Sequence, residues 1–269
     1  MLLIGEKING SIPKTRDIIL RRDTGALVEL AKTQARAGAD YVDVNVATGA
    51  GSLSDESAAM SWAVDALRRE TDFGLCIDSS DPDVMRAGLE KTDHRPVMIN
   101  SVNAETDRLR NIIPLAVQYR ATLIALLMDD DGIPKNPDGR IRSLDHILTA
   151  CGNAGLETEK LYIDPLAIPI STDQRQAAVT LDTIKLIKKR YPDLKMVLGL
   201  SNISFGLPGR ARINASFLTM AICHGVEAAI LDTLEPELMS AIRTAEAIMG
   251  KDRHFRRYAR SFRNKNKSK

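Results

Sequence analysis

The feature that most constrains the fold is a regular alternation, along almost the whole chain, of short apolar runs with longer segments of helical periodicity. Each run has four to seven mostly apolar residues, which is the form expected of parallel strands buried on both faces. The predicted strands are Leu2–Lys7, Tyr41–Asn45, Gly74–Asp78, Val97–Asn100, Thr122–Met128, Leu161–Asp164, Met196–Leu200 and Ala228–Leu231.

The segments between these runs carry apolar residues at helical spacing, as in Gly25–Ala37, Asp55–Arg69, Thr106–Tyr119, Asp173–Arg190 and Pro236–Met249. Eight strands and eight helices in strict alternation predict one domain, a (β/α)8 TIM barrel, which typically needs about 250 residues. An open doubly wound sheet is the alternative. Such a sheet usually has a GxGxxG turn after its first strand, whereas this chain reads EKINGSIPKT there.

Charge divides the chain into a predicted barrel, residues 1–250, and a basic C-terminal tail, residues 251–269. The tail holds nine Lys or Arg and one Asp, a net charge of +8, although the whole chain carries only +2. Two interpretations stay open: a frayed, solubilising end, or a segment that docks onto an acidic partner or subunit. Binding to nucleic acid is disfavoured, because the basic residues are confined to the terminus and form no folded patch.

The compartment expected from the sequence is a reducing cytoplasm. The first residues, MLLIGEKING, do not resemble a signal peptide, and no apolar stretch is long enough to span a membrane. The three cysteines, Cys76, Cys151 and Cys223, are far apart and form no CxxC or Cys/His cluster. Neither a disulfide framework nor a zinc site is therefore expected.

Polar residues stand at the ends of the predicted strands, most clearly in LCIDSS, VMINSVN, LYIDPL and VLGLSN. In a barrel of parallel strands these ends meet at one face, where the active sites of such enzymes lie. For Asp43 and Asp232, a helix N-cap is an equally good explanation. The expected mouth residues are Glu6, Asn9, Asp43, Asn45, Asp78, Asn100, Asn103, Met128, Asp129, Asp164, Asn202 and Asp232.

The residue types at this mouth restrict its chemistry. Almost no His, Lys or Cys is among them, which argues against a catalytic triad and against Schiff-base chemistry. A carboxylate site without His would suit only a hard cation, so a generic carboxylate-metal barrel is a weak alternative. Carboxylates and carboxamides are well suited to grip a flat heterocycle, because they match its ring N–H, amino and lactam groups. Pterins and guanine both carry that pattern.

Five ordered motifs, GEKING, CIDSS, MINSVNAE, YIDPL and GLSNISFGLP followed by RIN, resemble the methyltetrahydrofolate:corrinoid-protein methyltransferases. That family shares a pterin-binding barrel with the folate domain of cobalamin-dependent methionine synthase and, more distantly, with dihydropteroate synthase. The resemblance covers about residues 1–250 and leaves out the basic tail. It implies a methyltransferase of one-carbon metabolism that moves a methyl group between N5 of tetrahydrofolate and cobalt.

The resemblance also implies roles for individual residues, with no metal held by the chain itself. Asp78, Asn100 and Asp164 would anchor the pterin, with Asp164 on its aminopyrimidinone edge. Asn202 would be the catalytic side chain, reaching N5. Met128 would line the pterin face, and Arg210 would meet the folate tail or the corrinoid partner. Further companions at the mouth would be Glu6, Asn9 and Asn45.

The corrinoid (cobalamin) is expected on a separate partner protein, because this chain has no DxHxxG segment; Asp93-His94 and Asp145-His146 have the wrong spacing. A homodimer is implied by the resemblance alone. Two alternatives remain. A dihydropteroate synthase needs Asn-x-Thr-Pro-Asp-Ser-Phe after the first strand and a Lys on the seventh, where this chain has Asn9-Gly-Ser-Ile-Pro and Gly199-Leu-Ser-Asn202. A non-catalytic folate-binding barrel would bind folate without exchanging methyl groups.

Overall fold

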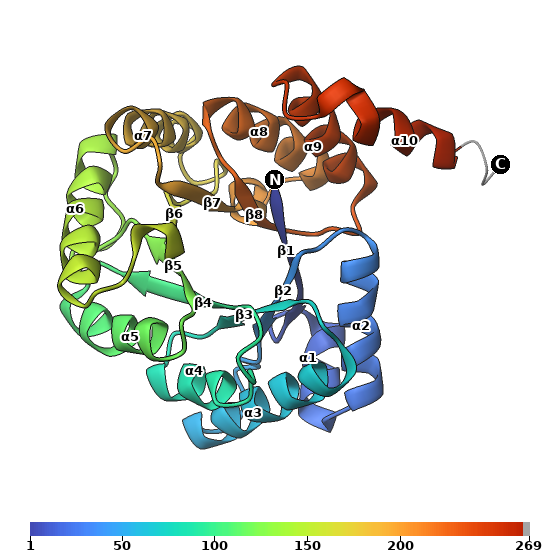
Figure 1. Cartoon of the computed structure of the whole chain (residues 1–269), viewed down its shortest axis with the longest axis vertical. Helices are drawn as coiled ribbons and strands as arrows, with labels where there is room; N and C mark the ends of the chain where they lie inside the picture. The colour runs from blue at the N-terminus through green and yellow to red at the C-terminus, as the bar shows by residue number, and fades with distance from the viewer. Residues whose placement is uncertain (266–269) are drawn as a thin grey trace.

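The computed structural model describes residues 1–265 and shows a closed barrel of eight parallel strands, each paired with its neighbours in chain order (Figure 1). The prediction of a (β/α)8 barrel is confirmed. Strand bounds differ from the predicted ones by a few residues at most. The strands are β1 Leu2–Asn9, β2 Tyr41–Asn45, β3 Gly74–Asp78, β4 Val97–Asn103, β5 Thr122–Leu126, β6 Leu161–Asp164, β7 Lys195–Gly199 and β8 Ala228–Leu231.

Helices form the outer ring of the barrel (Figure 1). The eight that connect or follow the strands are α2 Thr24–Arg36, α3 Leu53–Glu70, α4 Pro82–Leu89, α5 Thr106–Gln118, α6 Pro137–Asn153, α7 Gln176–Arg190, α8 Arg210–His224 and α9 Pro236–Ile248. The short 3-10 helices are η1 Thr158–Lys160, η2 Leu200–Ser204 and η3 Arg253–Phe255. The helix predicted to begin near Asp55 in fact begins at Leu53, because Ser52 and Asp55 form a capping box.

Strict alternation is wrong in the first connection, which contains an additional helix, α1 (Pro13–Arg21). Pro13 fits the first helical turn, where its missing N–H is not needed. Arg22 then adopts a left-handed conformation that ends α1, and the Asp23 carboxylate accepts a hydrogen bond from Ala26 N and caps α2. The two helices are thus separated by two residues that break one helix and start the next.

The inside of the barrel is filled by an apolar layer beneath the strand ends. Because side chains alternate along a strand, the residue two positions before a polar strand end faces the same way as that end. Cys76 precedes Asp78 in this manner, and Met98 precedes Asn100. The barrel is therefore a packed core with a polar mouth and not a pore. The buried members of this layer are Ile4, Cys76, Met98, Ile124, Val197 and Ala228.

A β-bulge in β1 sets the alignment of the mouth residues. The pairing of β1 with β2 shifts register between Gly5 and Ile8, and the Gln34 side chain accepts a hydrogen bond from Lys7 N at 2.9 Å. Gln34 thereby provides an acceptor for an amide at the irregularity. Beyond the bulge, Asn9 lies level with Asn45.

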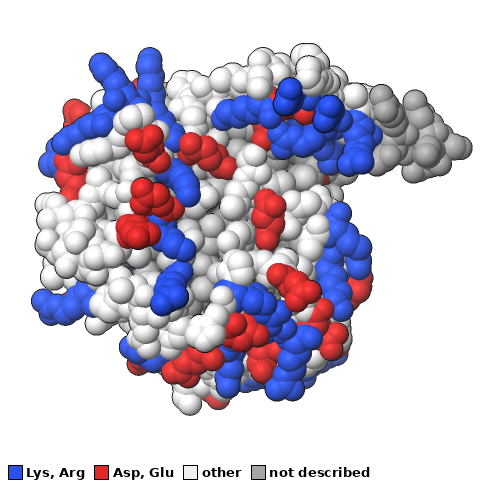
Figure 2. Space-filling view, in the orientation of Figure 1, with Lys and Arg blue, Asp and Glu red and all other residues white. Residues whose placement is uncertain are grey.

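The basic tail is helical over most of its described length. After η3, helix α10 (Arg256–Lys265) follows, and Figure 1 shows it extending past α9 away from the barrel. The Asp252 carboxylate accepts hydrogen bonds from Arg257 N and Tyr258 N, and Arg257 forms an ion pair with Glu246 at 3.2 Å. Of the two interpretations left open for the tail, a frayed end does not fit residues 253–265, and residues 266–269 lie outside the described part. Figure 2 shows a band of basic side chains over this region.

None of the helices within residues 1–265 has the length and apolar character needed to cross a bilayer.

A fully buried arginine holds the connection that follows β6. Arg140, on α6, donates hydrogen bonds to the carbonyl oxygens of Pro165 and Leu166 and to Thr180 and Gln176 on α7. Burial lowers the pKa of Arg140 to about 10, an effect that the nearby Asp164 carboxylate opposes. This arginine therefore fixes the backbone directly after Asp164.

We expect Arg140→Leu to lower the free energy of unfolding by about 3 kcal/mol, because buried carbonyl groups lose their donor. Arg142→Leu, two residues along on the exposed side of the same helix, is the control and should change stability by less than about 0.5 kcal/mol. Urea unfolding of the three proteins measures both values. Equal stability of the two variants would contradict a structural role for Arg140.

Candidate active site

Four polar residues stand level with one another at the ends of β1 to β4. The strand registers pair Asn9 with Asn45, Asn45 with Asp78, and Asp78 with Asn100. The Asn45 amide donates a hydrogen bond to Asp78 at 2.9 Å. The Asn100 amide reaches one layer deeper and donates to Asp43 at 3.2 Å. The structure thus gathers these predicted site residues into one row.

Asp43 and Asp78 form a pair of carboxyl groups that share a hydrogen bond. Burial raises the pKa of Asp43 well above its usual range, and the charge of Asp78 raises it further. Burial also raises the pKa of Asp78, which the hydrogen bond from Asn45 partly offsets. Two buried carboxylates cannot both ionise cheaply at this separation. Of the two groups, Asp43 has the more strongly raised pKa, so burial and the neighbouring charge favour its protonated form.

Asp164 lies across the mouth at the end of β6 and is almost completely buried. Its two carboxylate oxygens accept hydrogen bonds from Leu166 N at 2.8 Å and from Gly199 N at 3.1 Å. Burial raises the pKa of Asp164 to about 6, against the opposing effects of these two hydrogen bonds and of Arg140. Each oxygen can accept a further hydrogen bond, so the carboxylate retains capacity for a ligand with two donors.

Asn202 is exposed and lies in the 3-10 turn η2 just after β7. Gly199 separates it from Asp164. A Cβ atom on Gly199 would lie 3.3 Å from the Asn202 amide nitrogen and 3.5 Å from an Asp164 oxygen. The amide and the carboxylate therefore approach the same backbone position, and the missing side chain of Gly199 leaves room between them.

Ser201 connects the turn that carries Asn202 to the rest of the mouth. Its hydroxyl donates a hydrogen bond to Glu6 at 2.7 Å, and its carbonyl accepts one from Arg210 at 2.7 Å. Arg210 also donates to the Ser204 hydroxyl at 3.0 Å. Burial is the main cause that raises the pKa of Glu6 above its usual value, and the hydrogen bond from Ser201 opposes it. Glu6 and Arg210 thus hold both sides of the turn.

The remaining predicted residues take more peripheral positions. Asn9 accepts hydrogen bonds from both the amide and the hydroxyl of Ser11, and Met128 is half-buried just beyond β5. Asp232 forms an ion pair with Lys7 at 2.6 Å and does not cap α9, whose N-cap is Glu235.

The sequence left the role of one mouth residue, Asp43, undecided and gave no indication of another, Ser201. Asp43 was expected to be a helix cap as often as a site residue, yet it lies within β2, inside the barrel. The signal was available, because Asp43 precedes Asn45 by two positions and so shares its face. The contact between Ser201 and Glu6 joins residues 195 positions apart, and no local pattern could indicate it.

The mouth carboxylates do not gather into a group of three or more His, Cys, Asp or Glu side chains suited to a metal ion, as far as residues 1–265 are concerned.

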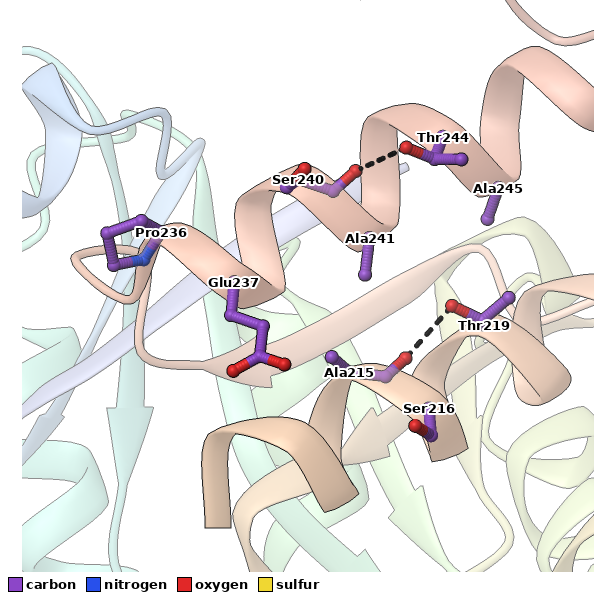
Figure 3. Close-up of a pocket in the computed structure, with 9 residues that line it drawn as sticks. All are labelled: Ala215, Ser216, Thr219, Pro236, Glu237, Ser240, Ala241, Thr244 and Ala245. Carbon is purple, nitrogen blue, oxygen red and sulfur yellow. Dashed lines mark hydrogen bonds between the residues drawn. The ribbon is translucent and has the colours of Figure 1, made fainter. Parts of the chain in front are cut away.

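A groove of about 490 Å³ lies elsewhere, between α8 and α9 on the outer surface (Figure 3). Small side chains and Pro236 line it, and Glu237 is its one titratable residue. The hydroxyls of Thr219 and Thr244 already donate to carbonyl oxygens of their own helices, as the dashed lines in Figure 3 show. This groove offers no catalytic constellation, so the mouth is the candidate active site.

The chain is similar in sequence to several known proteins. A family model described as pterin binding enzyme matches residues 10–232. The chain is 32% identical over 265 residues to the methylcorrinoid:tetrahydrofolate methyltransferase of Eubacterium limosum, covering 98% of this chain and 96% of that protein. It is 31% identical over 245 residues to methionine synthase of Mycobacterium tuberculosis, covering 86% of this chain but only 20% of that protein.

Solved structures of dihydropteroate synthases share the fold. The enzyme from Vibrio fischeri superposes with a TM-score of 0.72 at 18% identity, over 93% of each chain. The enzyme from Yersinia pestis gives a TM-score of 0.71 at 18% identity, also over 93% of each chain. At this level of identity the likeness establishes the barrel architecture alone.

The raised pKa of Asp43 predicts how Asp43→Asn changes stability with pH. Because the pKa of Asp43 is raised in the folded state, its favourable contribution is complete below about pH 4 and is lost as the pH rises through the folded pKa. An asparagine mimics the protonated carboxyl without titrating. The variant should therefore gain stability relative to wild type as the pH rises.

Urea unfolding at a series of pH values from about 4 to 8 tests this expectation. Asp83→Asn makes the same charge change at an exposed position on α4 and is the control. A constant difference between Asp43→Asn and wild type across the series would show that Asp43 holds no shared proton.

Proposed function

The chain belongs to the family of pterin-binding enzymes, and on that premise we propose that it transfers a methyl group between N5 of tetrahydrofolate and the cobalt of a corrinoid carried by a separate protein. The observation that carries the proposal is the 32% sequence identity, over almost the full length of both chains, to a methylcorrinoid:tetrahydrofolate methyltransferase. The polar row of the mouth and the exposed Asn202 beside Asp164 supply groups that such a reaction needs.

Asp78, Asn100 and Asp164 bind the pterin in this proposal. Asp164 accepts hydrogen bonds from the ring N–H and the exocyclic amine, using the acceptor capacity that its two backbone contacts leave. Asn100 can donate and accept at once, which suits a lactam edge, and the proton held by Asp43 keeps Asp78 available as an acceptor. Met128 lies against the pterin face, while Asn9 and Asn45 complete the row.

Asn202 acts on the bond that breaks. A methyl group on a tertiary amine leaves poorly, because the departing nitrogen anion is too basic. One proton added at N5 balances the reaction: the N5–CH3 bond breaks, the electron pair returns to N5, and the product carries N5–H. The Co(I) corrinoid supplies the nucleophile that accepts the methyl group.

A carboxamide does not titrate near neutral pH, so Asn202 is not a conventional general acid. In this proposal water delivers the proton to N5. Its amide donates a hydrogen bond that strengthens as the electron pair returns to N5, which is preferential binding of the transition state. Glu6, through Ser201, and Arg210 hold the turn in place. In this proposal Arg210 also meets the folate tail or the corrinoid partner.

A dihydropteroate synthase activity is less well supported, although the fold is shared. The strand-seven lysine that such a site needs is missing at the mouth: β7 has one lysine, Lys195, at its first residue. The Lys195 ammonium group lies over the Tyr162 ring and donates to the carbonyl of Glu159, at the end of the strand away from the mouth.

We further propose a cytoplasmic homodimer in which residues 1–250 form the barrel domain and residues 251–269 an appended basic tail. Cys76, Cys151 and Cys223 are free thiols, which suits a reducing compartment. The small side chains of the groove between α8 and α9 would permit close approach of a helix from a second copy (Figure 3).

A spectroscopic assay with free cobalamin tests the proposed function. With methyltetrahydrofolate present, the enzyme should convert free cob(I)alamin to methylcobalamin, and with tetrahydrofolate it should demethylate methylcobalamin. No folate-dependent change in either direction would exclude methyl transfer and favour a non-catalytic folate-binding barrel.

In this assay Asn202→Ala should lower the rate of methyl transfer roughly a hundredfold, the usual cost of one transition-state hydrogen bond donor. The folate dissociation constant should change by no more than about threefold, since the exposed amide contributes little to ground-state binding. Asn153→Ala, an exposed asparagine at the end of α6, is the control. Equal losses of rate and of affinity would mean that Asn202 only binds the folate.

Asp164 should make folate binding depend on pH. The carboxylate is the acceptor, and its pKa is about 6, so affinity should be full above that pH. Below it, affinity should fall by about tenfold per pH unit as Asp164 takes up a proton. Asp164→Asn should bind folate weakly at every pH, with no change of affinity near pH 6. Asp164→Ala should abolish folate binding without unfolding the barrel. Calorimetric folate titrations give these affinities; normal titration of the Ala variant would refute the assignment.

A further inference from the structure

A pocket of about 500 Å³ lies at the end of the barrel opposite the mouth. Tyr41, the first residue of β2, and Thr122, the first residue of β5, form part of its wall. The connections that lead into β4, β5 and β6 contribute Arg95, Arg120 and Lys160. Because all eight strands are parallel, strand starts lie at one end of the barrel and the candidate active site lies at the other. The pocket is therefore separate from the folate site.

The charged side chains that line this pocket are all basic. Arg95 is already paired, with Asp93 at 2.7 Å and with Asp72 at 3.3 Å. The Arg120 guanidinium has no hydrogen bond or ion pair within residues 1–265, and the Lys160 ammonium group contacts only the Arg120 carbonyl oxygen, at 3.4 Å. Two cations thus line the pocket with nearly all their hydrogen-bond donors unused.

A further cation lies behind the pocket wall. The buried Arg68 of α3 donates hydrogen bonds to the carbonyl oxygens of Phe73 at 3.0 Å and of Pro96 at 2.8 Å, and Pro96 lines the pocket. Its Nε has no partner among the described residues. Burial lowers the pKa of Arg68 to about 10, and the positive charge of Arg95 lowers it further. An anion bound in the pocket would reduce this repulsion between cations.

Two hydroxyl groups add neutral donors to the pocket. The hydroxyls of Tyr41 and Thr122 form no hydrogen bond with any other part of residues 1–265. Burial raises the pKa of Tyr41, so its phenol keeps the proton and can donate it to a ligand. Gly74 makes room for the Tyr41 ring, because a Cβ atom there would lie 2.4 Å from a ring carbon. The ring supplies a half-buried apolar surface beside the cations.

Strained backbone borders the same pocket. Asp93, His94 and Arg120 adopt left-handed conformations, with φ of 46°, 63° and 53°, although none of them is glycine. His94 and Arg120 line the pocket directly. Such conformations are costly for residues with a side chain, and they are concentrated at binding sites.

We propose that this pocket binds a phosphate group, either as inorganic phosphate or as part of a small organic ester. A phosphate carries close to two negative charges and three strong acceptor oxygens, which match two cations and two hydroxyls better than a carboxylate does. Arg120 and Lys160 belong to separate connections that the Lys160 contact holds together. The cavity also has room for an organic group, which the Tyr41 ring would contact. This inference does not depend on methyl transfer.

Calorimetric titrations with inorganic phosphate, AMP and adenosine, at low salt and without folate, test the proposal. The wild type should bind phosphate and AMP but not adenosine. Arg120→Gln and Lys160→Gln should each weaken binding about tenfold, because each variant loses a charge-assisted hydrogen bond, and the double variant should show no binding. Arg142→Gln on α6 and Lys185→Gln on α7 remove the same charges at exposed positions and should bind as the wild type does.

The ligands distinguish the two sources of phosphate. Tighter binding of AMP than of phosphate would identify an organic ester as the ligand, and equal or weaker binding would identify inorganic phosphate. A wild type that binds neither, or that binds adenosine as tightly as AMP, would overturn the proposal. Undiminished binding in the double variant would also overturn it. The two single variants should transfer methyl groups to free cobalamin within about twofold of the wild-type rate, so the two proposals fail independently.

Discussion

The burial of carboxyl groups in the mouth of a closed barrel is the constraint on which the site depends. Asp43 and Asp164 are nearly inaccessible and Asp78 is half-buried, and within residues 1–265 no lysine or arginine side chain is bonded to any of the three. Each group must therefore be stabilised by N–H donors or by a proton. Asn45, Asn100 and two backbone amides supply the donors, and the raised pKa of Asp43 favours its protonated form. The abundance of asparagine at the mouth follows from the same requirement, because a carboxamide donates without adding charge.

A second constraint is that the reactive side chain must be exposed and yet held in place. The turn after β7 meets it with contacts from both sides, Glu6 of β1 through Ser201 and Arg210 from the start of α8. Gly199 leaves the space between Asp164 and Asn202 free of a side chain. Binding groups lie deep on the strands, and the group proposed to act on the scissile bond lies on an exposed turn, where a second macromolecule can reach it.

The fold was largely predictable, since eight buried strands leave eight apolar runs and the intervening helices leave a 3.6-residue period. The ends of helices and strands were predicted less well. Several neighbouring residues can serve as a helix cap, and at α3 the capping box of Ser52 with Asp55 moved the start by two residues. Helix α1 was missed because a short segment with a proline at its start looks like a loop. The helical tail was missed because nine basic residues indicate a solvated end, whereas Asp252 and Glu246 bind Arg257 there.

The sequence by itself determined the barrel, the strand ends that carry Asp78, Asn100 and Asp164, and the motifs that place the chain among pterin-binding enzymes, because each of these is encoded within a few consecutive residues. Only the tertiary structure decided which polar groups meet. The register that sets Asn9, Asn45, Asp78 and Asn100 level, the pairing of the Asp43 and Asp78 carboxyl groups, and the contact of Ser201 with Glu6 all join segments far apart in the chain. Such contacts arise from closure of the sheet, which brings the last strands beside the first, and no local pattern in the chain records them.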